Sequence, residues 1–183
     1  MRVLLLICWL VVVHWAQAQE YNYVRYDTRD GLAGSTVYDV VQDKDGFIWF
    51  ATENGLSRFD GKYFKNYTVK DGLPDNEVLT LFADSKGRVW MGTFSKQLCY
   101  ISKGKIHNAQ NDTLLSKVVW NADISKIVES NAGELFVSDQ RSLYKLDQHN
   151  RWQNLTAHAM FQPHPFKRLN MGHPSRPPPR SWG

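Results

Sequence analysis

The chain alternates short apolar runs with polar turns that contain glycine, and the alternation repeats after 41 residues. The first copy runs from Asp43 to Phe59, and the second runs from Asp84 to Ile101. Each copy opens with Asp-x-x-Gly and continues into an apolar run that contains Trp-x-x-Thr. A repeat of about 40–45 residues with this make-up is typical of a β-propeller blade of four strands. The pattern therefore predicts an all-β fold.

The first copy also indicates where its strands lie. Its β-branched and aromatic runs suit a pleated, half-buried surface. The Asp-Gly and Asn-Gly pairs between these runs supply the positive φ that tight turns need. Trp49 and Trp90 are expected to pack between neighbouring blades, because a large ring buries much apolar area. The predicted strands of this copy are at about 36–42, 47–52, 55–60 and 63–68.

The same offset extends beyond these two copies. Asp30-Gly31-Leu32 recurs as Asp71-Gly72-Leu73, and a weaker third copy begins near Ser130, which stands at the aspartate position. In that copy Asp139 replaces the threonine. A leading strand at 21–26 resembles the outermost strand of a preceding blade. We therefore expect a partial propeller of about three four-stranded blades, at about 36–68, 77–108 and 123–156.

The positions that both clear copies share are expected to be structural. They are Asp43, Gly46, Trp49 and Thr52 in the first copy, and Asp84, Gly87, Trp90 and Thr93 in the second. A blade cannot bury both of its faces alone, and closed propellers have about four to eight blades. Three blades leave two apolar faces open, so we expect that further blades of a longer protein cover them, that other copies of the chain do, or that the three blades do not fold alone.

The N-terminal residues 1–18 have the pattern of a secretory signal peptide. Arg2 supplies the charge, Val3–Val13 the apolar core, and Ala16-Gln17-Ala18 the cleavage motif, with cleavage expected between Ala18 and Gln19. A membrane anchor is the alternative, but the apolar run is short for a span. We therefore expect an exported mature protein whose propeller repeats occupy residues 19–156.

Residues 157–183 differ in composition from the rest of the chain. They hold six of the seven prolines, four basic residues and no acidic residue. A partner-binding or membrane-surface segment and a disordered tail are both open, but a frameshift or truncation after about Thr156 is favoured, because the repeat register stops there. Residues 19–156 are near neutral, with 17 Lys and Arg against 18 Asp and Glu, so the basic pI does not indicate nucleic-acid binding.

The motif that the two copies share is specific enough to indicate a protein family. The motif Val-x-x-x-x-x-Asp-x-x-Gly-x-[Ile/Val]-Trp-x-x-Thr-x-x-x-Leu, preceded by Asp-Gly-Leu, resembles the two-component regulator propeller repeat. It covers residues 20–101 closely and 124–156 loosely. The resemblance implies the N-terminal periplasmic sensor region of a Bacteroidetes-type hybrid histidine kinase that works through a phosphorelay. This chain has no phospho-acceptor histidine motif, ATP lid or receiver, so we expect a fragment that is not itself an enzyme.

The resemblance also implies partners. It implies an oligosaccharide ligand, the remaining propeller blades, a homodimer when the protein is full length, and a membrane anchor only if a downstream transmembrane helix is present. Ligands of propellers contact loops at one end of the central channel, here the loops around Leu32–Thr36 and Pro74–Glu77. The ligand-binding candidates on or near these loops are Arg29, Asp75, Asn76 and Glu77.

No catalytic, cofactor or metal site is expected. Asp43 and Asp45 suit turn chemistry better than paired-acid catalysis. A calcium loop with Gly46 at its sixth position would need carboxylates at Val41 and Thr52, which have none. Cys99 is expected in the core. The histidines of the mature chain are expected on surface loops, and they are His107, His149, His158, His164 and His173. The three Asn-x-Thr triplets, at Asn66, Asn111 and Asn154, are interpreted as strand-end chemistry.

Two other classes of protein stay open. A secreted propeller enzyme or scaffold, such as a polysaccharide lyase or an adhesin, would need a Tyr/His/Arg cluster or a metal site on the channel loops. A defective gene without a functional product is the other alternative.

Overall fold

The computed structural model describes residues 23–156, so the predicted signal peptide, its Ala18–Gln19 cleavage site and the segment 157–183 lie outside the described residues. Within 23–156 the chain forms three antiparallel four-stranded sheets, and the sequence order of the strands is their order in each sheet. The regular helical elements of this part are three single turns of 3-10 helix. The predicted all-β, partial-propeller fold is confirmed.

The strands of the first sheet begin and end within one residue of their predicted positions. Blade 1 contains β1 (Val37–Gln42), β2 (Ile48–Thr52), β3 (Gly55–Phe59) and β4 (Phe64–Tyr67). Blade 2 contains β5 (Val78–Ala83), β6 (Val89–Thr93), β7 (Leu98–Ser102) and β8 (Lys105–His107). Blade 3 contains β9 (Ile124–Glu129), β10 (Leu135–Asp139), β11 (Leu143–Leu146) and β12 (Trp152–Asn154). The 3-10 turns are η1 (Thr28–Asp30), η2 (Val69–Asp71) and η3 (Leu115–Lys117).

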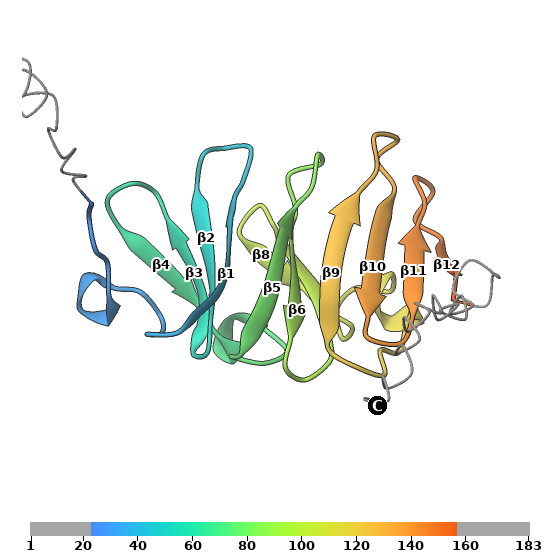
Figure 1. The fold of residues 1–183 in the computed structure, drawn as a ribbon, viewed down its shortest axis with the longest axis horizontal. Helices are drawn as coiled ribbons and strands as arrows, with labels where there is room; N and C mark the ends of the chain where they lie inside the picture. Colours follow the sequence, from blue (N-terminus) through green and yellow to red (C-terminus); the bar gives the residue numbers. More distant parts are fainter. Residues whose placement is uncertain (1–22, 157–183) are drawn as a thin grey trace, which may run out of the picture.

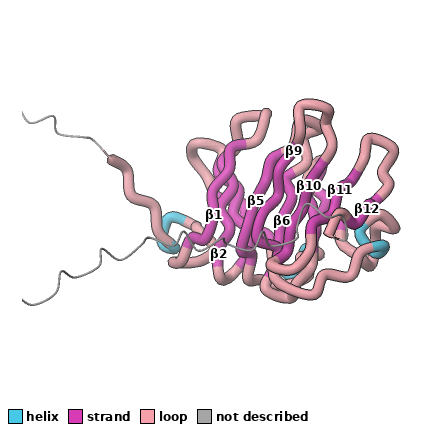
Figure 2. Tube along the Cα trace, turned by 45° about the vertical axis from the view of Figure 1, so that its right-hand side comes forward, coloured by secondary structure: helices cyan, strands magenta, loops and turns pink. Residues whose placement is uncertain are grey.

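The three sheets stand side by side, and their first strands, β1, β5 and β9, are neighbours (Figure 1). The loops gather at two ends of the strands (Figure 2). We call the upper end in Figure 1 the turn end, because it carries the hairpins that follow β1, β5 and β9. We call the opposite end the loop end, because it carries the longer connections from one blade to the next, at 68–77 and 108–123.

Alternate residues of each strand fill the spaces between blades, as the two-residue period of a strand requires. Between blades 1 and 2, Trp49 and Leu56 pack with Val78 and Met91. Between blades 2 and 3, Trp90 joins a second buried cluster that includes Ile127 and Val137 of blade 3. Each tryptophan therefore faces the following blade. The core consists of two clusters of buried side chains, one between blades 1 and 2 and one between blades 2 and 3.

A carboxylate at the turn end holds each of these tryptophans. Asp43 Oδ1 accepts the backbone N–H groups of Asp45 and Phe47, and Asp43 Oδ2 accepts the Trp49 indole N–H at 2.6 Å. Gly46 closes this turn at a φ of 88°, which is costly for other residues. One aspartate side chain thus fixes both the hairpin and the ring that packs below it.

The second blade repeats this arrangement and adds a cation. Asp84 Oδ2 accepts the Trp90 indole N–H at 2.8 Å and the Arg88 Nε at 2.6 Å, while Oδ1 accepts the N–H groups of Lys86 and Arg88. The side chain of Asp84 is fully buried. The Arg88 guanidinium also lies over the Trp90 ring, 4.7 Å from its centroid. The charge of Asp84 is therefore matched by one ion pair and by hydrogen bonds.

The third blade departs from the motif at its aspartate, tryptophan and threonine positions, and its hydrogen bonds account for these changes. Phe136 stands at the tryptophan position and has no N–H to satisfy, and Ser130 stands at the aspartate position. Ser130 Oγ accepts only the backbone N–H of Glu134, at 3.3 Å. At the other substituted position, the buried Asp139 accepts the N–H groups of Arg141 and Ser142 and so closes the β10–β11 turn. Each substitution keeps the donors and acceptors of the turn balanced.

The Asp-Gly-Leu motif is a cap that anchors the chain before each of the first two blades. Asp30 and Asp71 close capping boxes around η1 and η2, and the following Gly31 and Gly72 adopt φ of 107° and 104°. The carbonyls of the two glycines accept side-chain amides from the outer part of the blade that follows, from Asn66 and Asn108. This tie holds the approach to each blade against its last strand.

One sequence expectation is wrong. The described part of the expected strand at 21–26 forms no strand, because residues 23–27 have no neighbouring strand to pair with. Tyr26 instead lays its ring against Phe59 and Phe64, at centroid distances of 4.9 and 5.7 Å. The segment is held by aromatic packing on blade 1 rather than by a hydrogen-bond ladder.

We predict that the Asp84–Trp90 pair is coupled. Asp84→Ser should destabilise the chain by about 3 kcal/mol, because it leaves the Arg88 charge and the indole N–H without their partner. Trp90→Phe should cost about 2 kcal/mol through lost packing. The double variant recreates the Ser and Phe of blade 3 and should cost about 1 kcal/mol less than the sum. Urea unfolding of the four proteins measures this coupling.

The matched control is the mismatched pair Asp43→Ser with Trp90→Phe, which belongs to two different turns and should be additive. Additivity in the Asp84–Trp90 cycle would contradict the role assigned to this hydrogen bond.

Candidate ligand-binding end

At the loop end, as at the turn end, a carboxylate binds the backbone of a loop. At the start of blade 1, Glu53 accepts the N–H groups of Ser35 and Thr36, each at 2.9 Å, and the Ser35 hydroxyl at 3.1 Å. Burial works to raise the pKa of Glu53, but these hydrogen bonds hold that pKa below its ordinary value of 4.5. The loop that leads into β1 is therefore fastened by one carboxylate.

All four candidate ligand-binding residues have hydrogen-bond or ion-pair partners within the chain. Asn76 Oδ1 accepts the N–H of Val69 at 2.9 Å, which fastens the 68–77 connection to η2. Asp75 Oδ1 accepts the N–H of Glu77 at 3.1 Å, within the same connection. Arg29 belongs to η1 and not to the channel loops. Its side chain is 88 % exposed and forms an ion pair with Asp27 at 2.6 Å.

The fourth candidate, Glu77, faces the neighbouring first strand. Its carboxylate accepts the hydroxyl of Tyr38 at 2.8 Å, and this hydrogen bond raises the pKa of Tyr38. Just beyond, Asp39 Oδ2 of β1 accepts the backbone N–H of Leu81 at 2.7 Å and the Thr80 hydroxyl at 3.2 Å. These bonds join the first strands of blades 1 and 2. Of the four candidates, the structure brings Asp75, Asn76 and Glu77 together and leaves Arg29 apart.

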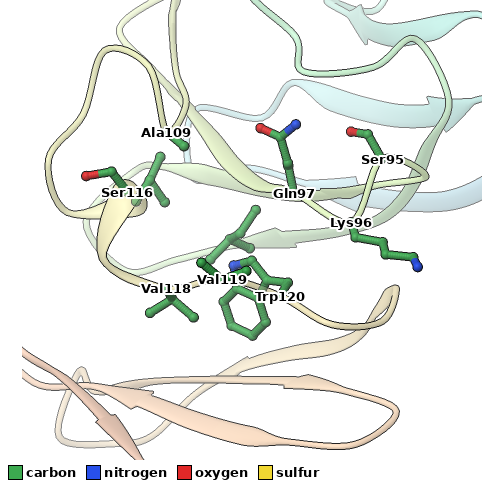
Figure 3. Close-up of a pocket in the computed structure, with 10 residues that line it drawn as sticks. Ser95, Lys96, Gln97, Ala109, Ser116, Val118, Val119 and Trp120 are labelled. Carbon is green, nitrogen blue, oxygen red and sulfur yellow. The ribbon is translucent and has the colours of Figure 1, made fainter.

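A pocket of about 320 Å³ opens at the loop end between blade 2 and the connection that leads to blade 3 (Figure 3). We call it the blade 2–3 pocket. Its apolar lining includes Leu98, Leu115 and Val119, and its polar lining includes the side chains of Gln97 and Lys96. Its volume is at the low end of the range for small-ligand pockets, about 300–1,000 Å³.

Trp120 forms one side of this pocket. Its ring packs on blade 3, with centroids 4.9 Å from Tyr144 and 6.0 Å from Trp152. The side chain is only 8 % exposed, yet it lines the pocket. Figure 3 shows its six-membered ring directed toward blade 3 and its nitrogen on the side of Val119 and Gln97. Trp49, Trp90 and Trp152 donate their indole N–H groups within residues 23–156, and Trp120 does not.

Two residues of this pocket depart from the repeat, and these departures could have indicated the pocket from the sequence. Trp120 stands outside the tryptophan position of the repeat, so the blade framework gives no reason for it. Gln97 occupies the place that Gly55 holds in the first copy. Departures from a repeat are where a function specific to one blade is expected to lie.

A polar cluster on the outer side of blade 2 needs no ligand to explain it. The Tyr100 hydroxyl donates to Asp112 at 2.5 Å, and burial together with this bond raises the pKa of Tyr100 to about 12. Burial works to raise the pKa of Asp112, but the Tyr100 bond and the N–H of Leu114 lower it overall. His107 stacks on Tyr100 at 4.6 Å. The expectation that His107 lies on a surface loop is therefore wrong, because it belongs to β8.

The remaining sequence candidates lie as follows. Cys99 is completely buried between blades 1 and 2, and burial raises the pKa of its thiol. His149 is exposed in the turn before β12. Asn66, Asn111 and Asn154 each hydrogen-bond to neighbouring protein groups. His158, His164 and His173 lie outside the described residues.

Among the residues that the structure describes, no three His, Cys, Asp or Glu side chains are grouped so as to hold a metal ion. Across residues 23–156, no helix has the length and apolarity needed to cross a membrane.

The fold and its repeat define a β-propeller repeat protein. Residues 31–54 and 72–95 both match the family model described as Two component regulator propeller. The chain therefore carries repeats of the two-component regulator propeller family, as its motif predicts. The two matches cover the Asp-x-x-Gly turns and the Trp-x-x-Thr strands of blades 1 and 2.

Similar proteins agree with this assignment. The curated protein Histidine kinase P4 of Formosa agariphila is 38% identical over 63 residues. Among solved structures, an extracellular domain of a hybrid two component system from B. thetaiotaomicron aligns over 73% of this chain with 25% identity and a TM-score of 0.62. An extracellular domain described as a one component system from the same organism aligns over 70%, with 25% identity and a TM-score of 0.55.

The chain spans a small part of each of these relatives. It covers 5% of the kinase and 20% and 18% of the two extracellular domains. A streptogramin B lyase structure shares the fold at 18% identity and a TM-score of 0.51, which carries nothing about activity.

We predict that Glu53 makes the stability of the loop end depend on pH. Its pKa is lowered in the folded chain, so its contribution is present above the ordinary value of 4.5 and is lost as the pH falls through the folded pKa. Wild type should melt at a higher temperature than Glu53→Gln at pH 6, and the difference should shrink below about pH 4. Thermal unfolding between pH 3 and pH 7 measures it. A difference independent of pH would show that the carboxylate charge plays no part.

Proposed function

We propose that residues 23–156 belong to the ligand-sensing propeller of an exported, periplasmic two-component signalling protein, and that the ligand is a glycan. The observation that carries the proposal is the pair of two-component regulator propeller repeats, folded as consecutive blades. The resemblance in fold and sequence to an extracellular domain of a hybrid two component system supports it.

The glycan part of the proposal has a physical basis at the loop end. Sugars bind to surfaces that combine apolar or aromatic area with a few polar groups that fix orientation. The loop end has both, because Phe94 is 58% exposed and Tyr38 is 44% exposed, and the amide of Gln97 lines the blade 2–3 pocket. The turn end is different, since the side chains of Asp43 and Asp84 are already occupied by its backbone and tryptophans.

The proposed mechanism is a shift between two arrangements of a dimer. A ligand biases such an equilibrium only by its difference in affinity for the two states. The blades supply the binding energy, and kinase, receiver and output parts of the whole protein would carry the response. Residues 23–156 by themselves bind and do not catalyse.

A first test is binding. The chain should bind a subset of an array of neutral and acidic oligosaccharides, and it should release them unchanged. Absence of binding by the folded chain would overturn the glycan proposal. Cleavage of a bound glycan would instead favour a secreted propeller enzyme such as a polysaccharide lyase.

A second test is phosphorylation. Incubation of the purified chain with radiolabelled ATP should leave no phosphohistidine, because residues 23–156 form propeller blades and the proposed kinase domain lies in another part of the whole protein. A catalytically competent histidine kinase in the same assay serves as the positive control. Label on any histidine of this chain would contradict the proposal that the propeller is a binding module.

A further inference from the structure

We propose that the blade 2–3 pocket is a subsite for a carboxylate-bearing sugar, that is, a uronic acid residue of a glycan. The inference rests on the proposed function and deepens it by naming the site and the class of sugar. Its elements are the indole N–H of Trp120, the amide of Gln97 and the ammonium of Lys96, all in the lining of one pocket.

The first step is the unpartnered donor. The Trp120 side chain is more than nine-tenths buried, and its N–H has no acceptor among residues 23–156. The Trp120 nitrogen is not among the fully buried unpartnered side-chain atoms of this part, which are the Arg58 Nε and the Tyr67 hydroxyl, so a molecule in the pocket can reach its N–H. An acceptor atom of a ligand in the pocket would satisfy it.

The second step is the chemistry of the lining. The charged side chain of the lining is Lys96, and no aspartate or glutamate lines the pocket. The Gln97 amide makes no side-chain hydrogen bond within the described residues, although its carbonyl accepts the N–H and hydroxyl of Thr93. The Gln97 amide and the hydroxyls of Ser95 and Ser116 can donate as well as accept, and the Trp120 indole and the Lys96 ammonium can only donate. An ionised carboxylate accepts hydrogen bonds from all of these groups and carries the charge opposite to that of Lys96.

The third step is shape. The apolar side chains of Leu98, Leu115 and Val119 also line the pocket. The pocket of about 320 Å³ therefore suits one sugar ring, with an apolar face against the side chains and its carboxylate toward Trp120 and Gln97. Lys96 lies exposed at the rim, and its long flexible stem lets the ammonium approach the bound anion.

The test measures binding of digalacturonate and of its neutral counterpart, galactobiose, by isothermal titration calorimetry. The wild-type chain should bind the acidic disaccharide more tightly, and added salt should weaken that binding. Trp120→Phe removes the N–H and keeps a ring against blade 3, so it should weaken binding about tenfold. Gln97→Glu places a carboxylate of nearly the same size beside the ligand and should weaken binding by at least about tenfold.

Lys96 allows a matched control. Lys96 and Lys103 both have left-handed backbones, with φ of 59° and 50°, but Lys103 lies at the turn end. Glycine adopts this conformation freely, so neither Lys96→Gly nor Lys103→Gly strains the fold. Lys96→Gly should weaken digalacturonate binding about threefold, as the loss of an exposed ion pair does, and Lys103→Gly should leave it unchanged.

The outcomes separate this subsite from the wider proposal. Equal binding of the two disaccharides, or acidic binding that survives Trp120→Phe and Gln97→Glu in folded variants, would overturn the subsite and leave glycan sensing in place. Failure of digalacturonate to bind would also overturn it. Failure of every sugar on the oligosaccharide array would overturn the proposed function itself.

Discussion

The hydrogen bond from a tryptophan ring to the aspartate of the preceding turn is the interaction on which the blades depend. A propeller blade must be closed at its hairpin and must bury a face against its neighbour. In blades 1 and 2 a single carboxylate serves both needs, because Asp43 and Asp84 bind the backbone of the turn with one oxygen and the indole with the other. The turn and the inter-blade core are thereby placed relative to each other.

The same reasoning explains why the third copy is degenerate and still folds. Replacing tryptophan by Phe136 removes the N–H, and Ser130 then suffices to close the turn. An aspartate left there without the indole would bury a charge with fewer partners, which is costly. Degeneracy of a repeat therefore occurs in coupled positions and does not reflect loss of the fold.

The turn end and the loop end differ in the length and the variability of their connections. At the turn end, short hairpins use their carboxylates internally, which makes them rigid and leaves few groups for a ligand. At the loop end, the connections between blades are longer, and they differ from one blade to the next. Asp75 and Asn76 are used within the chain there, while Gln97 and Trp120 retain groups that make no bond inside residues 23–156. Variation between blades at one end lets a repeated framework carry a single site.

The sequence by itself determined the fold, the repeat and most strand limits of blade 1, because strand period and turn chemistry are local properties of the chain. It also pointed to the loop end through the position of the loops between blades. Tertiary structure decided the rest. Tyr26 packs its ring against Phe59 and is not part of a strand, since a strand forms only where a neighbouring strand can pair with it. The pocket joins Gln97 to Trp120, 23 residues apart, only because blade 3 closes against blade 2, and no local pattern encodes that approach.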